Sequence, residues 1–355
     1  MILNGTHYTR QQIIERIGNP DQLGGLRPVV LAEGKARGLD AIELDTGGGL
    51  TATVLPGRGL DISRADYKGT NLVYRSAVGD IHPSFYEPEG LGWLRTFTAG
   101  LLTTCGLTYF GPPNTDQGET LGLHGRYSTL PARQVNHRTW WNGDDYEMEI
   151  SGITEEGALF GDKMRLTRRI RTQLGASGLT IHDTAENIGF QETPLCLLYH
   201  INLGFPLLDT EARLYVSSDQ VIPRDEHAGS GLEERFTFSP PIPGWEEQCY
   251  FYKMNAGANG MAHAALVNPD LDGGLGVCIS FSRETLPWLT EWKMVGQGDY
   301  VLGVEPGNLP VMSRNSLRQE GMLETLTPGE TRDFQVHLDV LEGQEAIAPF
   351  LGDTQ

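Results

Sequence analysis

Two histidines and one glutamate are the residues of this sequence best suited to acid–base chemistry. His124 lies between Gly122 and Gly125, and an imidazole titrates near neutral pH. His200 lies within an apolar run, where a polar group is costly unless it has a partner. Glu305 ends another apolar run before a proline, so partial burial would raise its pKa toward that of a general base. The alternatives are structural: core histidines bonded to backbone, and a salt-bridged glutamate at a strand end.

A second group of side chains could bind a substrate, because each adds a polar or flat aromatic surface in a segment that glycine or proline turns interrupt. An arginine offers forked donors for hydroxyl pairs, carboxylates or phosphates. A strand places alternate residues on one face, so an asparagine two residues after His200 shares its face. One arginine lies between two glycines of the segment 55–62, where backbone can approach a ligand, or it is a turn residue paired with Asp61. The five predicted contacts are Arg58, Arg126, Asn202, Trp292 and Lys293.

Other catalytic motifs are absent from the sequence. It contains no GxSxG, P-loop or HExxH motif. The glycines 47–49 lead into a strand rather than a helix, which argues against a dinucleotide cofactor. His82, Glu87 and Glu89 lack a tight metal-ligand spacing. We therefore predict neither a cofactor nor a metal.

Composition limits the partners and the compartment. The chain has 27 Lys and Arg against 46 Asp and Glu, a net charge of −19, which argues against nucleic acid and anionic membrane partners. No apolar run reaches the roughly 20 residues of a membrane span, and no basic segment followed by an apolar stretch opens the chain. The four cysteines form no CxxC pair, which is typical of buried reduced thiols in a cytoplasmic protein.

The pattern of short alternating segments predicts an all-β fold. The 45 glycines and 20 prolines are spread along the chain, and strands recur roughly every ten residues, as in a sandwich or barrel. Helical periods between the strands are missing, so a parallel α/β sheet is not expected. The clearest strands are 41–44, 50–55, 146–150, 163–170, 179–183, 213–216, 248–252, 277–281, 300–304 and 334–338.

The domain organisation follows from the same pattern. Thr9 could cap a helix over 10–17 that Gly18 would end. A length of 355 residues allows two domains, but no boundary is evident. We predict an N-terminal helical extension over 1–27 and a single β-sandwich over 28–345. The edge strands of a sandwich could pair with a second copy, so a homodimer is compatible with the fold.

Taken together, these segments resemble the aldose 1-epimerase (galactose mutarotase)-like superfamily, and within it an uncharacterised bacterial branch that carries a domain of unknown function. The resemblance covers roughly residues 29–341. Segment 123–126 (LHGR) resembles the loop with the family's first active-site histidine. Segment 199–203 (YHINL) resembles the one with the second, the general acid, and 304–306 (VEP) the strand end with the general base.

The resemblance implies a fold and a mechanism. The family fold is a large antiparallel β-sandwich, the supersandwich. By analogy His200 would protonate the ring oxygen of a pyranose while Glu305 removes the proton of the anomeric hydroxyl. His124 would hold or polarise the ring. The ring opens, the carbonyl turns and the ring closes as the other anomer, without a cofactor.

Departures from the family pattern leave the substrate open. Mutarotases carry a further sugar-binding aspartate between the second histidine and the glutamate, and Asp270, Asp272 and Glu291 are unmatched candidates. The cations among the predicted contacts favour an anionic sugar, such as a uronate or a sugar phosphate. They are equally compatible with an epimerase or isomerase that acts beside a carbonyl.

Two other classes of function compete with the sugar epimerase. One is a sugar-binding or sensor protein without turnover, and the other is a sandwich lyase or hydrolase that acts on polysaccharide. A separation of more than roughly 10 Å between His200 and Glu305 would exclude the leading hypothesis, because both groups must reach one substrate.

Overall fold

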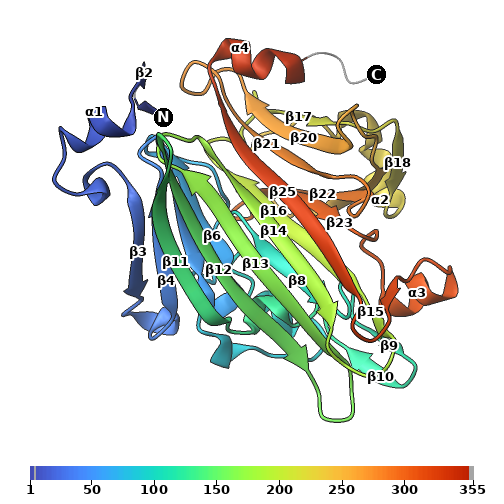
Figure 1. The fold of residues 1–355 in the computed structure, drawn as a ribbon. Helices are drawn as coiled ribbons and strands as arrows, with labels where there is room; N and C mark the ends of the chain where they lie inside the picture. The colour runs from blue at the N-terminus through green and yellow to red at the C-terminus, as the bar shows by residue number, and fades with distance from the viewer. Residues whose placement is uncertain (4, 352–355) are drawn as a thin grey trace.

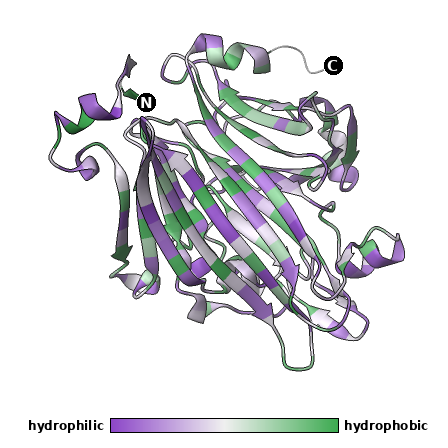
Figure 2. Ribbon diagram, in the orientation of Figure 1, coloured by the Kyte–Doolittle hydropathy of each residue, from purple (hydrophilic) through white to green (hydrophobic). Residues whose placement is uncertain are grey.

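Alternating apolar and polar residues build the largest sheet of the protein. In the computed structural model, which describes residues 1–3 and 5–351, β14 buries every second residue along its length. Figure 2 shows the matching bands of hydrophilic and hydrophobic colour along the long strands. One face of this sheet is therefore core and the other meets solvent. In spatial order its eight strands are β11 (Arg133–Asn142), β12 (Asp145–Gly157), β13 (Lys163–Gln173), β14 (Gly178–Asn187), β25 (Thr331–Glu342), β21 (Leu275–Ser282), β20 (Met261–Asn268) and β17 (Arg213–Val216).

A six-stranded sheet lies behind the first one (Figure 1). Its strand β16 is buried at all nine positions, so both of its faces are covered. The main core fills the space between the two sheets, with Tyr199, Ile201 and Val304 from the six-stranded sheet and Ile181 and Leu338 from the eight-stranded one. In spatial order the six strands are β18 (Gln220–Pro223), β19 (Gln248–Lys253), β22 (Trp288–Val295), β23 (Tyr300–Gly307), β16 (Cys196–Gly204) and β8 (Thr103–Leu107).

A smaller apolar cluster covers the opposite face of the six-stranded sheet. Trp93 and Phe97 come from the segment between β7 and β8, and they pack with Leu198 of β16 and Leu309, which follows β23. Because neighbouring residues of a strand point to opposite faces, His200 lies on the side of this cluster and Tyr199 on the side of the main core.

A five-stranded sheet and short elements complete the chain. Within the described residues, all strand pairs of the six sheets are antiparallel. The five-stranded sheet contains β3 (Gly25–Val30), β4 (Asp40–Asp45), β5 (Leu50–Leu55), β6 (Asp61–Tyr67) and β7 (Thr70–Asn71). The two-stranded sheets pair β1 (Ile2–Leu3) with β2 (Thr6–His7), β9 (Asn114–Asp116) with β10 (Glu119–Leu121), and β15 (Thr193–Pro194) with β24 (Thr325–Leu326). The α-helices are α1 (Arg10–Ile14), α2 (Glu226–Ser230), α3 (Arg314–Gln319) and α4 (Gln344–Ile347). The 3₁₀ turns are η1 (Pro20–Gln22), η2 (Gly34–Ala36), η3 (Pro56–Arg58), η4 (Pro83–Phe85), η5 (Gly92–Arg95), η6 (Tyr127–Thr129), η7 (Leu232–Glu234) and η8 (Ala348–Phe350).

The structure confirms the predicted all-β antiparallel sandwich. Each of the ten predicted strands falls within a strand of the structure. Thr9 caps α1 through its side chain, which accepts from the backbone N–H of Gln12, but the helix ends at Ile14 rather than at residue 17. Strand β3 begins at Gly25, inside the segment predicted as the helical extension.

The N-terminal segment packs against the large sheet, where Met1 and Ile13 contact Met148 and Leu174. The four cysteines are buried and none forms a disulfide. Among the described residues, no helix is long and apolar enough to cross a membrane.

Candidate functional site

His200 and Glu305 lie side by side on neighbouring strands. Pairing of Ile201 with Val304 sets the register of β16 and β23, so His200 and Glu305 are opposite each other on the same face. The Nε2 atom of His200 is 3.3 Å from Oε1 of Glu305, and both side chains are less than a tenth exposed. This contact lacks hydrogen-bond alignment, and Glu305 Oε1 has no other partner among the described residues. A buried carboxylate oxygen therefore stands unpaired beside the imidazole of His200.

The loop between β10 and η6 brings His124 to this pair. The imidazole rings of His124 and His200 are 5.7 Å apart, centre to centre. The backbone of His124 bonds to two glycines, accepting from Gly106 N at 3.2 Å and donating to Gly111 O at 3.0 Å. His124 has a φ of 57°, a left-handed conformation that is uncommon for a non-glycine residue and marks a constrained position. The three predicted acid–base residues thus converge on one site.

Aromatic rings surround His200. The ring of Phe97 is 5.0 Å from His200, and that of Trp292 is 5.5 Å away in an edge-on arrangement. Trp93 lies 4.8 Å from His124 and 6.4 Å from His200. The sequence analysis selected Trp292 but missed Trp93 and Phe97. The sequence does contain one indication of them, because these two aromatic residues lie four positions apart in a segment flanked by glycines.

Burial shifts the pKa of Glu305, His200 and His124 in the direction that favours the uncharged form of each group. It raises the pKa of Glu305 well above 4.5, and the nearby charge of Glu247 raises it further. Burial also lowers the pKa of His200 well below 6.5, with His124 adding to the effect, and it lowers the pKa of His124 to about 4. Desolvation disfavours the charged form of each group, which accounts for the opposite directions. Both shifts favour the state in which Glu305 carries a proton and His200 is neutral.

Two of the predicted cationic contacts are not part of this group. Arg58 is only 1% exposed, and its guanidinium donates to the carbonyls of Ile81 at 3.1 Å and Thr96 at 2.9 Å. Lys293 points to the opposite face of β22 from its neighbour Trp292, and its Nζ donates to two backbone carbonyls at 2.8 Å. Arg58 thus holds the segment that carries Trp93 and Phe97, and Lys293 anchors the segment around η7.

Two more of the predicted contacts, Arg126 and Asn202, differ in their exposure to solvent. Arg126 is about one third exposed, lies over the ring of Tyr109 at 5.6 Å and approaches Glu156 at 3.5 Å. Asn202 is fully buried on the site face of β16, next to His200 rather than at the surface.

A glutamate that the sequence analysis did not select lies beside the site. Glu247 Oε2 accepts from the indole N–H of Trp292 at 2.7 Å, and Oε1 pairs with Arg224 at 2.6 Å. Its side chain is 45% exposed, so it remains open to solvent. Glu247 precedes β19 by one residue in a segment rich in charge and turns, where sequence alone gave no reason to prefer it.

The three carboxylates considered for the missing sugar contact lie elsewhere. Glu291 faces the opposite side of β22 and accepts from the hydroxyl of Tyr252 at 2.6 Å. Asp272 accepts from Thr70 at 2.6 Å, and Asp270 is exposed in the turn after β20. Glu247 is therefore the carboxylate that accompanies the His200–Glu305 pair.

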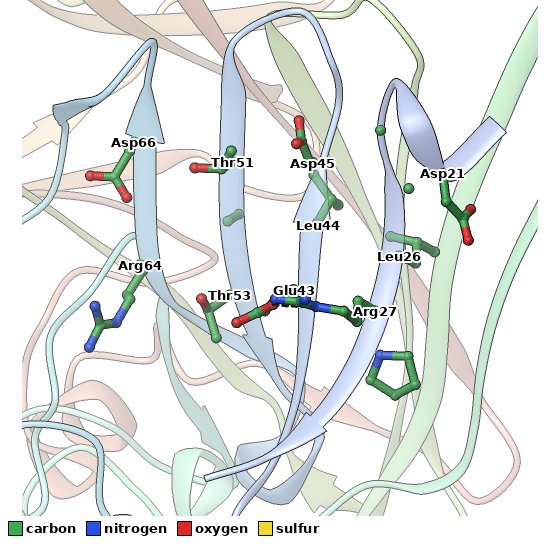
Figure 3. Close-up of a pocket in the computed structure, with 14 residues that line it drawn as sticks. Asp21, Leu26, Arg27, Glu43, Leu44, Asp45, Thr51, Thr53, Arg64 and Asp66 are labelled. Carbon is green, nitrogen blue, oxygen red and sulfur yellow. Dashed lines mark hydrogen bonds and ion pairs between the residues drawn. The ribbon is translucent and has the colours of Figure 1, made fainter. Parts of the chain in front are cut away.

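A separate groove of about 690 Å³ runs over β3, β4, β5 and β6 (Figure 3). Its side chains are mainly charged or hydroxylated, and Arg27 donates to Glu43 across it at 2.8 Å. None of the predicted site residues lines this groove. Within the described ranges, no three His, Cys, Asp or Glu side chains are grouped to hold a metal ion. The predicted acid–base residues therefore lie outside the groove, with His200 and Glu305 on the six-stranded sheet.

Gly303 is the position where a single methyl group should disturb the pair most directly. A Cβ at this position would overlap Oε1 of Glu305 and lie 2.9 Å from Cβ of Trp292. We expect Gly303→Ala to push the carboxylate out of position, and the kcat of any reaction that depends on the pair to fall by about 10²-fold, the typical cost of a misplacement near 1 Å. Gly152→Ala is a matched control in a strand, because its Cβ would meet only side-chain atoms at 3.0 Å or more. Equal kcat in the two variants would contradict the expectation.

Three solved structures with the same fold are described as aldose or galactose 1-epimerases or as a mutarotase-like protein. A Klebsiella pneumoniae protein assigned provisionally as an aldose 1-epimerase is 27% identical to this chain, with a TM-score of 0.87 over 98% of this chain and 96% of the other. A galactose mutarotase-like protein from Clostridium acetobutylicum is 16% identical, with a TM-score of 0.62 over 91% and 100%. A galactose 1-epimerase from Lactobacillus acidophilus is 14% identical, with a TM-score of 0.57 over 90% and 99%. These likenesses confirm the mutarotase-like fold.

The sequence comparisons identify the family. No curated protein matches the chain. The model of one family, described as a domain of unknown function, DUF4432, matches residues 36–340. This agrees with the predicted resemblance to an uncharacterised branch of the mutarotase-like proteins. The chain therefore belongs to the DUF4432 family, with the fold of the galactose mutarotase-like proteins.

Proposed function

We propose that this protein is a sugar epimerase that interconverts the anomers of an aldose by acid–base catalysis. The observation that carries the proposal is the contact between His200 and Glu305, two buried titratable groups 3.3 Å apart on neighbouring strands. The likeness to proteins described as aldose 1-epimerases supports a sugar as the substrate. Both proton transfers need a positioned acid and base, and each contributes typically 10²–10⁴-fold.

The His200–Glu305 pair can catalyse both ring opening and ring closure, because each step reverses the proton transfers of the other. In the ionised form His200 donates its Nε2 proton to the ring oxygen while Glu305 takes the proton of the anomeric hydroxyl. The bond between the anomeric carbon and the ring oxygen breaks, and the open-chain aldehyde leaves His200 neutral and Glu305 protonated. Ring closure on the other face of the carbonyl reverses both transfers. The pair thus starts and ends with one proton.

The surroundings of the pair favour a sugar with free hydroxyl groups. Trp292 offers an aromatic face next to His200, and Glu247 offers an exposed carboxylate that could accept hydroxyl hydrogen bonds. Two of the cations that favoured an anionic sugar, Arg58 and Lys293, donate to backbone carbonyls instead. We therefore propose a neutral pyranose, with uronates and sugar phosphates as the alternatives to test.

The test is anomer exchange, measured by magnetisation transfer in NMR. A panel of aldoses, uronates and sugar phosphates would be equilibrated with wild type and with His200→Ala. We expect exchange faster than in buffer for at least one neutral aldose, and exchange at the buffer rate with the variant. A panel without any acceleration, in protein that is folded, would overturn the proposal and favour a binding protein. Homodimerisation and cytoplasmic location stay predictions.

The pH dependence of kcat/KM should be a broad plateau with two limbs. On the acid side activity falls when His200 gains a proton while Glu305 keeps its own. Because burial lowers the pKa of His200, this limb lies well below pH 6.5. On the alkaline side activity falls when the last proton leaves, and because burial raises the pKa of Glu305 this limb lies well above pH 4.5. A profile corrected for the buffer rate checks both limbs, and an acid limb at pH 6.5 would contradict the account.

A further inference from the structure

The amide of Asn202 has a fixed orientation beside His200. Its Nδ2 donates to the carbonyl of Gly100 at 3.1 Å and to that of His200 at 2.8 Å. A carbonyl oxygen cannot replace Nδ2 in these bonds, so the two ends of the amide are distinguished by the network. The Oδ1 atom therefore points away from both carbonyls. Asn202 is fully buried, which makes an unpaired acceptor costly there.

One atom of Asn202, Oδ1, and one atom of His200, Nδ1, remain without a hydrogen-bond partner among the described residues. Among the described residues, neither Oδ1 of Asn202 nor Nδ1 of His200 has a hydrogen-bond partner of good geometry, and both atoms are buried. The two side chains lie on the same face of β16, two residues apart. The Nε2 atom of His200 faces Glu305, so Nδ1 is the ring nitrogen that remains for Asn202.

We propose that Asn202 is a positioning residue whose Oδ1 accepts the Nδ1–H of His200 and so fixes the tautomer of its imidazole. The proton on Nδ1 then stays in place throughout the reaction. The Nε2 atom alone gains and loses a proton, and it is the nitrogen that faces Glu305. The role in turnover rests on the proposed function, whereas the tautomer itself does not. Hydrogen bonds of this kind are often long in a free enzyme and shorten when substrate binds.

The groups around His200 are consistent with this assignment. Glu305 faces Nε2 and burial raises its pKa, and the ring of His124, whose pKa burial lowers to about 4, lies 5.7 Å away. Thr103 is the cross-strand neighbour on β8, and its hydroxyl donates to the carbonyl of Ala99 at 2.8 Å. Burial and His124 lower the pKa of His200, and the side chain of Asn202 opposes them. Removal of Asn202 should therefore lower the pKa of His200 further.

The tautomer can be observed directly in the wild-type protein. Histidine labelled with ¹⁵N gives distinct shifts for a protonated and an unprotonated ring nitrogen in long-range ¹H–¹⁵N spectra. The chain has 9 histidines, and the spectrum of His200→Gln identifies the signals of His200. At pH 7 we expect a protonated Nδ1 and an unprotonated Nε2. The opposite tautomer, with the proton on Nε2, would overturn the proposal whether or not any sugar is turned over.

Variants separate positioning from mere stability. Asn202→Leu removes the acceptor, so we expect the spectrum to contain signal of the Nε2–H tautomer. Because a wrong tautomer impairs the chemical step, kcat should be at least about tenfold lower, whereas KM should change little. Asn187→Leu is the matched control: Asn187 is also fully buried and donates to two carbonyls, Gln191 O and Leu326 O, each at 2.8 Å. It should lose stability but keep the tautomer and kcat.

The outcomes distinguish the two proposals. If Asn202→Leu keeps the wild-type tautomer of His200, or if Asn187→Leu alters it equally, Asn202 is not a positioning residue. If the tautomer depends on Asn202 but no sugar is turned over, the positioning proposal stands and the proposed function fails. If Asn202→Leu does not fold, the wild-type spectrum still decides the tautomer, and Asn202→Asp, which keeps an acceptor and adds charge, should raise the pKa of His200.

Discussion

Glu305→Gln is expected to lower the kcat of anomer exchange by roughly 10²–10⁴-fold, the usual contribution of a positioned general base. Glutamine keeps the shape of the side chain but cannot take a proton from the anomeric hydroxyl. Glu305 is 2% exposed and burial raises its pKa well above 4.5, which favours the neutral carboxyl, so a neutral amide should not destabilise the fold. The measurement is magnetisation transfer between anomers at saturating sugar, together with the free energy of unfolding in denaturant.

A buried glutamate on the neighbouring strand provides the control for this variant. Glu291 on β22 is fully buried, and burial raises its pKa to about 7, but it faces away from His200. Glu291→Gln should therefore keep the wild-type rate. The double variant of Glu305→Gln with His200→Ala should lose little more than either single variant, because groups that act as a unit are not additive. A Glu305→Gln protein with more than about half the wild-type kcat would exclude Glu305 as the base.

The largest expected effect on stability is that of Arg168→Met. Arg168 is completely buried and joins two buried aspartates, with Nη2 2.7 Å from Asp183 and Nη1 3.2 Å from Asp61. Asp61 also accepts from the backbone and hydroxyl of Thr104, and Asp183 accepts from the hydroxyl of Tyr199, the neighbour of His200. Removing the cation leaves two buried carboxylates without compensation, a change that costs about 3–5 kcal/mol.

Chemical denaturation of Arg168→Met would measure this cost. The exposed neighbour Arg169 on the same strand gives the control, because Arg169→Met should stay within about 0.5 kcal/mol of wild type. Burial already raises the pKa of Asp61 to about 6 although Arg168 opposes the rise, and without the arginine the pKa should rise further. A raised pKa in the folded state favours stability at low pH, so the deficit should shrink as the pH falls from 7 toward 5. A deficit below about 1 kcal/mol at pH 7 would contradict the interpretation of a coupled network.

The all-β architecture was readable from the sequence because its cause is local. Alternation along segments such as 163–170 and 213–216 reports a strand with one buried face, and the glycines mark the turns between strands. The helix over 10–17 was predicted too long, because Arg16 N donates to Ile13 O in a tighter turn at 2.8 Å, although Ile13 and Ile17 pack against the same apolar cluster. The pairing order of the strands depends on contacts distant in sequence, which no local pattern records.

The candidate site was partly predictable for the same reason. A histidine or glutamate inside an apolar run, such as His200 or Glu305, is conspicuous because burial of a polar group is costly. The wrong expectation for Lys293 has a clear cause: it follows Trp292 directly, and adjacent residues of a strand point to opposite faces. Phe97 and Glu247 reach the site through tertiary contacts, and only Phe97 left a signal in the sequence, its spacing of four residues from Trp93.

The most direct test of the central claim is anomer exchange in D₂O, followed by ¹H NMR on the sugar that gives the fastest exchange. In the proposed acid–base mechanism protons move only between oxygen or nitrogen atoms. The two anomers should therefore interconvert faster than in buffer while every C–H signal of the sugar keeps its intensity. Loss of this acceleration in Glu305→Gln would tie it to the His200–Glu305 pair. Deuterium incorporated at carbon would instead show epimerase or isomerase chemistry beside the carbonyl, and exchange at the buffer rate would show that the pair does not catalyse the reaction.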